Sequence, residues 1–121
     1  MNICVIGGSG YVGFITGLGF AELGNSVVNV DIDVEKVAAM NEGHSPIYEE
    51  GIDLNEVLRR NLQTDRIRFT TDLAEGVHHG GVIFIAVGTP EKESGQADLS
   101  QVISVAENLL DYIDSYKESS W

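Results

Sequence analysis

One short glycine turn constrains the fold of this chain more than any other feature. The turn reads GSGYVG at residues 8–13, and Asp31 follows the last of its glycines by 18 residues. An apolar run at residues 3–6 leads into the turn, and a segment with helical periodicity leaves it. A strand, a glycine turn of this spacing, a helix and a terminal acid are together typical of a dinucleotide-binding βαβ unit. We therefore expect the turn to be a ligand site.

Each part of the turn has its own predicted role. Gly8 lets the chain turn sharply after the strand, and Gly10 leaves room for a pyrophosphate beside the backbone. Gly13 lets the helix pack close to the sheet. The backbone N–H groups of Tyr11 and Val12 are expected to point at the phosphates from the helix N-terminus.

Asp31, at the end of the second expected strand, decides which dinucleotide is favoured. Its carboxylate can accept hydrogen bonds from both hydroxyls of the adenosine ribose, and its charge repels a 2′-phosphate. We therefore expect NAD as the cofactor and not NADP. Lys36, in the first turn of the next helix, can reach the adenosine or the phosphates; a solvated surface lysine is the alternative interpretation.

Apolar runs that alternate with helical segments predict a parallel sheet. We expect strands at residues 2–6, 26–31, 67–70 and 82–87, with helices between them and a last helix from Asp98. Right-handed crossovers then give an α/β, Rossmann-type doubly wound sheet of order 3-2-1-4-5-6, truncated here after about four strands. On the first helix, one apolar face is expected to be buried, formed by Val12, Ile15, Thr16, Gly19, Phe20 and Leu23.

Composition argues against several classes of function. The 121 residues carry a formal charge of −12, which disfavours a nucleic-acid or anionic-membrane partner. No apolar stretch is long enough to span a bilayer and no secretion leader is recognisable, so we expect a cytoplasmic protein. The single cysteine, Cys4, is predicted to be a buried core residue. His44, His78 and His79 are predicted to face solvent and to bind no metal.

The order of further motifs makes the chain similar to one family. The segment ICVIGGSGYVG is followed by AELGNSVVNVDID, SPIYEEGI, RIRFTTDLAEGV, VIFIAVGTP and SGQADLSQVISVAENLL. Over residues 2–117 this order resembles the N-terminal domain of UDP-glucose/GDP-mannose dehydrogenases. The resemblance implies that Val12, Asp31 and Lys36 contact NAD on its adenosine and pyrophosphate side. It also implies an NAD contact for the Thr89 hydroxyl after the fourth strand, where a plain strand terminator is the alternative.

Two positions depart from the family pattern. The family usually has EPG where this chain has Glu49-Glu50-Gly51. Gly7 precedes the glycine motif, so the turn is one residue longer than the commonest family form.

The resemblance implies an activity for a longer parent protein. The parent would oxidise the 6-hydroxyl of a nucleotide sugar, UDP-glucose in the leading interpretation, to a carboxylate with two NAD. The family's later segments, including an STVP motif and the loop with the catalytic cysteine, have no counterpart here. We therefore expect residues 1–117 to form an incomplete NAD-binding domain, with a tail at 118–121. This chain is expected to bind NAD without catalysis, and the nucleotide sugar is a partner of the full-length parent only.

Two other functions stay open at this point. A stand-alone regulatory module, of the kind that gates potassium uptake, has a similar length and the same βαβ start with a terminal acid. Such modules lack the sequence VGTP followed by ADLS, which is present here and disfavours this interpretation. Another NAD-dependent dehydrogenase, acting on hydroxyacyl or phosphogluconate substrates, is disfavoured by the PIYEEG loop.

The truncation also predicts an interaction surface. A fourth strand without its usual neighbour would be an exposed and wholly apolar edge. We therefore predict self-association through residues 82–87 or through the last helix.

Overall fold

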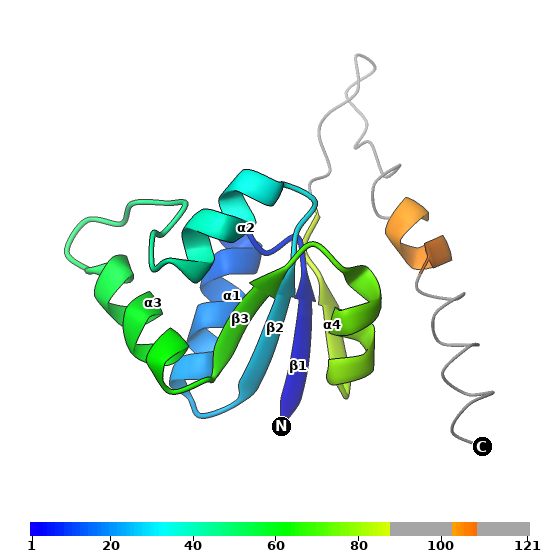
Figure 1. The fold of residues 1–121 in the computed structure, drawn as a ribbon, viewed down its shortest axis with the longest axis horizontal. Helices are drawn as coiled ribbons and strands as arrows, with labels where there is room; N and C mark the ends of the chain where they lie inside the picture. Colours follow the sequence, from blue (N-terminus) through cyan, green and yellow to red (C-terminus); the bar gives the residue numbers. More distant parts are fainter. Residues whose placement is uncertain (88–102, 109–121) are drawn as a thin grey trace, which may run out of the picture.

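A four-stranded parallel sheet forms the centre of the chain in the computed structural model, which describes residues 1–87 and 103–108 (Figure 1). Its strands are β1 (Asn2–Ile6), β2 (Ser26–Val30), β3 (Ile67–Thr70) and β4 (Val82–Ile85). They lie in the order β3-β2-β1-β4, and all three pairings are parallel. The expected Rossmann-type α/β fold and the order of its first four strands are confirmed.

Helices cover both faces of the sheet. α1 (Tyr11–Glu22), α2 (Val34–Asn41) and α3 (Leu54–Gln63) lie on one side, and α4 (Leu73–His79) lies on the other (Figure 1). Residues 103–108 form a further helical segment on the α4 side. None of the helices within the described ranges has the length and apolar character of a membrane span.

The two faces carry separate cores because side chains alternate along each strand. Ile3 and Val5 of β1 belong to the larger core beneath α1, α2 and α3. Cys4 and Ile6 belong to the smaller core beneath α4, and Val105 of the helical segment packs against that core.

The buried face of α1 differs from the predicted one. Val12 and Leu23 are 65% and 81% exposed. The buried positions are instead Gly13, Phe14, Gly17, Leu18 and Ala21. α1 is apolar on nearly every side, so periodicity alone does not select a face. The glycines select it, because a Cβ on Gly13 would collide with the Gly7 carbonyl and one on Gly17 with the Asn29 amide.

β4 ends at Ile85, two residues before the predicted end at Val87. The cause is the glycine turn, since β1 bends away at Gly7, where φ is +96°. The Ala86 N–H still donates to the Ile6 carbonyl at 2.7 Å. Among the described residues, β1 is the only strand that pairs with β4.

At the opposite edge of the sheet, one side chain pairs with the backbone of β3. The amide of Asn41, at the end of α2, pairs with both backbone groups of Phe69 in β3. Its Nδ2 donates to the Phe69 carbonyl at 2.9 Å, and its Oδ1 accepts from the Phe69 N–H at 3.0 Å. This amide satisfies backbone groups that an edge strand normally leaves free.

Candidate functional site

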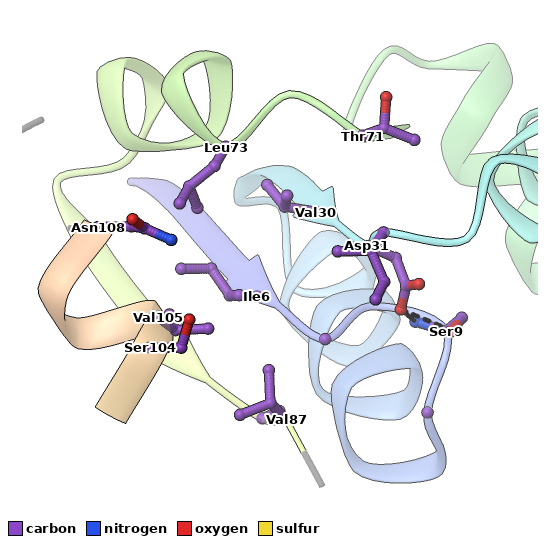
Figure 2. Close-up of a pocket in the computed structure, with 14 residues that line it drawn as sticks. Ile6, Ser9, Val30, Asp31, Thr71, Leu73, Val87, Ser104, Val105 and Asn108 are labelled. Atoms are coloured by element: carbon purple, nitrogen blue, oxygen red, sulfur yellow. Dashed lines mark hydrogen bonds between the residues drawn. The ribbon is translucent and has the colours of Figure 1, made fainter. Parts of the chain in front are cut away.

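The glycine turn joins β1 to α1 at the carboxyl end of the sheet (Figure 2). The sharp reversal occurs at Gly7, whose φ is positive, and not at Gly8 as predicted. The N–H groups of both glycines donate to the Val30 carbonyl, at 2.8 and 3.1 Å, which ties the turn to the end of β2. Gly8 has a packing role instead, because an added Cβ would lie 2.7 Å from the Cβ of Asn29.

Gly10 and Gly13 satisfy different constraints. Gly13 is required by the protein itself, because the Gly7 carbonyl occupies the position of a Cβ. Gly10 has an ordinary extended backbone, with φ −75° and ψ 164°. A Cβ there would meet only the Gly7 carbonyl oxygen, at 3.7 Å. The space in front of Gly10 is therefore open to a ligand.

The N-terminus of α1 is open, unlike those of the other three labelled helices. α2, α3 and α4 each have an aspartate as N-cap, whose carboxylate accepts a hydrogen bond from an N–H of the first turn, namely Asp33, Asp53 and Asp72. The N-cap of α1 is Gly10, which provides no side-chain hydrogen bond, and the first turn of α1 carries no acidic residue. The N–H groups of this turn form the positive end of a helix dipole and suit an anion.

Asp31 lies directly after β2, and its carboxylate closes onto the glycine turn (Figure 2). Oδ2 accepts from the Ser9 N–H at 2.9 Å and from the Ser9 hydroxyl at 2.6 Å. Oδ1 accepts from the Asp33 N–H at 2.9 Å. Burial raises the pKa of Asp31, but these hydrogen bonds and the charge of Lys36 outweigh it, so the net pKa is lowered. The strand end therefore holds a charged carboxylate beside the turn.

A pocket of about 630 Å³ opens next to this carboxylate. Ser9 and Asp31 form a polar end, and the strand ends and α4 supply apolar walls (Figure 2). The helical segment contributes Val105 together with the polar side chains of Ser104 and Asn108. The apolar wall includes Ile6, Val30, Leu73, Val87 and Val105. In open α/β sheets, ligands bind outside the carboxyl ends of the strands where the strand order reverses, and this pocket lies there, between β2, β1 and β4.

The structure brings only part of the predicted residue set to the pocket. Lys36 is exposed in the first turn of α2 and acts on Asp31 through its charge, but it does not line the pocket. Tyr11 and Val12 do not line the pocket, and they are 59% and 65% exposed. That their N–H groups donate to a phosphate stays a prediction. Thr89 lies outside the described residues.

Sequence reasoning missed two features of the site. Gly7 lines the pocket and makes the reversal, and its only signal was its position as a fourth glycine, directly before the three of the motif. Ser9 lies against Asp31, and a serine between two glycines carries no signal for such a contact.

The single cysteine lies away from the pocket, in the core beneath α4. Cys4 is fully buried, as predicted, and burial raises the pKa of its thiol to about 11. A thiol of this kind is a poor nucleophile. His79 is not simply solvent-facing, because its Nε2 lies 3.0 Å from the Ser26 carbonyl oxygen. Within residues 1–87 and 103–108, no three His, Cys, Asp or Glu side chains form a group that could hold a metal ion.

Comparison with known proteins agrees with this geometry. The family model described as the NAD binding domain of the UDP-glucose/GDP-mannose dehydrogenase family matches residues 1–118. The chain belongs to this family. The matched part is its NAD-binding domain, so NAD is the cofactor, and a stand-alone potassium-uptake module or a dehydrogenase of another family is set aside.

Individual relatives show how much of the family's length is represented. A UDP-glucose 6-dehydrogenase of Pseudomonas aeruginosa is 51% identical over 109 residues, which cover 90% of this chain and 23% of that enzyme. A UDP-glucose 6-dehydrogenase of Bacillus subtilis is 42% identical over 113 residues, or 93% of this chain and 25% of that enzyme. The chain therefore spans about a quarter of the length of these relatives.

Solved structures of the family have the same fold. The GDP-mannose dehydrogenase of Pseudomonas aeruginosa, solved as a ternary complex, matches with a TM-score of 0.84 at 37% identity, over 90% of this chain and 24% of that one. A UDP-glucose dehydrogenase from Pyrobaculum islandicum matches with a TM-score of 0.81 at 38% identity, over 90% of this chain and 25% of that one.

Proposed function

We propose that this chain is the cofactor-binding part of a UDP-glucose 6-dehydrogenase, which oxidises the 6-hydroxyl of UDP-glucose to a carboxylate with two NAD. The 51% identical relative of that name supports UDP-glucose as the sugar. In this proposal the catalytic cysteine and the contacts to the nucleotide sugar lie outside the 121 residues. Cytoplasmic location, a domain at residues 1–117 and a tail at 118–121 stay predictions.

The observation that carries the proposal is the open N-terminus of α1 beside a charged Asp31. In our proposal the NAD pyrophosphate lies over Gly10, on the N–H groups of Tyr11 and Val12. Gly8 and Gly13 hold the turn and helix in the geometry that exposes those groups. When bound, NAD supplies the hydride acceptor of the parent reaction.

The adenosine half of NAD would lie at the pocket described above. Asp31 is placed to accept hydrogen bonds from the ribose hydroxyls, and the adenine would contact the apolar wall. Ile32, which lines the pocket and is 94% exposed, suits such a contact. Lys36 and Thr89 are proposed as further NAD contacts, on the adenosine and pyrophosphate side and after β4 respectively.

Calorimetric titration with NAD and NADP tests this function. We expect wild-type protein to bind NAD, and to bind NADP at least about tenfold more weakly because the Asp31 charge repels a 2′-phosphate. Asp31→Asn should weaken NAD binding and reduce the preference over NADP. Asp53→Asn, which changes a helix cap away from the pocket, should leave the preference unchanged. A folded wild-type sample that does not bind NAD would contradict the proposal.

A further inference from the structure

The Asp31 carboxylate is already engaged in the cofactor-free protein. A carboxylate has about four lone-pair sites, two on each oxygen. Oδ2 uses both of its sites, for the Ser9 N–H at 2.9 Å and the Ser9 hydroxyl at 2.6 Å. Oδ1 uses one, for the Asp33 N–H at 2.9 Å. A single site, on Oδ1, remains for a further donor.

A ribose diol presents two hydroxyl donors and needs an acceptor site for each. With one site left on Asp31, both hydroxyls cannot be accepted unless a resident donor leaves. We propose that the Ser9 hydroxyl is a resident competitor for a ribose hydroxyl of NAD on Asp31 Oδ2, and that it thereby sets the cofactor affinity of this site. The inference rests on the proposed NAD site.

The hydroxyl, and not either N–H group, is the donor that can leave. The Ser9 N–H is fixed by the turn, because the neighbouring N–H groups of Gly7 and Gly8 are bonded to the Val30 carbonyl. The Asp33 N–H belongs to the residue that caps α2. The Ser9 hydroxyl needs only a rotation about χ1, and Ser9 lines the pocket, so the rotated hydroxyl has space.

The competition has a definite direction. The Ser9 hydroxyl bond is short and made to a charged acceptor, which is the stronger class of hydrogen bond. NAD must break it before both ribose hydroxyls can bind. Removing the hydroxyl should leave the turn N–H in place and free one site on Oδ2. We therefore expect tighter cofactor binding without Ser9 Oγ, by about three- to tenfold.

The test combines protein variants with ligands that lack one hydroxyl. Affinities of wild type and Ser9→Ala are measured by calorimetry for NAD, ADP, 2′-deoxy-ADP and 3′-deoxy-ADP. Ser9→Ala should bind NAD and ADP about three- to tenfold more tightly than wild type. The gain should vanish for at least one of the two deoxy ligands. Such a ligand has only one ribose hydroxyl, which can use the free site on Oδ1, so the Ser9 hydroxyl does not have to leave Asp31. A general change in turn stability would not depend on a ribose hydroxyl.

Two controls keep the result specific. Thr64→Ala removes a hydroxyl that does not line the pocket and that bonds the Arg60 and Asn61 carbonyls at the end of α3, so it should give no gain. The nearly isosteric pair Ser9→Thr and Ser9→Val keeps or removes the hydroxyl at equal bulk. Only Ser9→Val should show the gain, which covers the case that Ser9→Ala perturbs the turn.

Other outcomes would overturn the inference. Unchanged or weaker binding by Ser9→Ala and Ser9→Val would mean that the hydroxyl does not compete, or that it assists the ligand. A gain that is equal for all four ligands would also exclude competition with the ribose. Wild-type protein that binds neither NAD nor ADP would reject the proposed function itself, whereas normal wild-type binding with no gain in the variants rejects only the role of Ser9.

Discussion

At the scale of single residues, substitutions of the glycines in the turn should separate effects on stability from effects on NAD affinity. Gly13→Ala should destabilise the protein by about 1–3 kcal/mol, because the new Cβ overlaps the Gly7 carbonyl. Gly10→Ala should cost less than about 1 kcal/mol, because its Cβ fits and only the helix cap is weakened. The same Gly10 variant should lose at least about tenfold in NAD affinity, since the Cβ occupies the space proposed for the pyrophosphate.

Thermal unfolding and NAD titration of the two variants check this separation. The decisive comparison is a Gly10→Ala protein that melts near the wild type. If that protein also binds NAD as tightly as the wild type, the pyrophosphate does not lie over Gly10.

The Asp31 carboxylate also makes stability depend on pH. Its pKa is lowered in the folded protein, whereas an unfolded aspartate titrates near about 3.9. Folding therefore favours the ionised form, and the stabilisation is complete above the unfolded pKa. It is lost as the pH falls through the folded pKa. Because Asp31 is only partly buried, the gain at neutral pH should stay below about 1 kcal/mol.

Denaturant unfolding of wild type and Asp31→Asn as a function of pH measures this contribution. The two free energies of unfolding should differ most above about pH 5 and converge as the pH falls below about 4. Glu42→Gln, at the exposed end of α2, should run parallel to the wild type. A difference between wild type and Asp31→Asn that is constant over this range would show that the carboxylate is not stabilised by the fold.

At the scale of elements, the turn at Glu49–Ile52 explains a departure from the family pattern. The Ile52 N–H donates to the Glu49 carbonyl at 3.4 Å, and Gly51 has φ +83°. These features fit a turn of type II, which favours proline at its second position and glycine at its third. Glu50 holds the second position, where the family usually has proline.

Glu50→Pro should therefore stabilise the protein by about 0.4–1 kcal/mol, because proline restricts the unfolded chain and fits the turn. Among the described residues, the Glu50 N–H donates no backbone hydrogen bond that proline would remove. The midpoint of thermal unfolding measures the gain. Glu42→Pro should instead destabilise the protein, because the Glu42 N–H at the end of α2 donates a hydrogen bond to the Ala38 carbonyl. A lower midpoint for Glu50→Pro would mean that the second position has another backbone conformation.

The elements also show what could be predicted from the sequence. The strand order could be predicted from the βαβ pattern and the Rossmann-type fold that it indicates, and the spacing of the glycines to Asp31 predicted that Gly10 and Asp31 lie at one end of the sheet, where both line the pocket. The buried face of α1 could not be predicted, because its sides are similarly apolar and contacts to Gly7 and Asn29 choose among them. The Ser9–Asp31 contact joins positions 22 residues apart and depends on how the turn folds back onto β2. No local sequence pattern predicts this contact.

At the scale of the whole molecule, the outer side of β4 remains a predicted contact surface. Val82, Phe84 and Ile85 are 36%, 37% and 40% exposed in the described structure. We expect the chain to self-associate as its concentration rises, and Val82→Lys to shift it toward monomer, because a charge at a strand edge opposes pairing.

Light scattering after size-exclusion chromatography measures this equilibrium. Leu23→Lys, at the exposed end of α1, adds the same charge elsewhere and should leave association unchanged. A wild type that stays monomeric at high concentration would contradict the prediction.

The Asn41 amide makes the two edges of this sheet unequal for the addition of a further strand. It pairs with both backbone groups of Phe69 and so occupies hydrogen-bonding positions on the outer edge of β3. A strand added there would first have to break two hydrogen bonds, whereas none of the bonds within the described residues has to break on the β4 side. Any extension of the sheet, by a longer polypeptide of this family or by a second copy, is therefore directed to β4. Asn41 does not line the pocket, yet its two hydrogen bonds to Phe69 favour β4 over β3 as the edge at which this sheet can be extended.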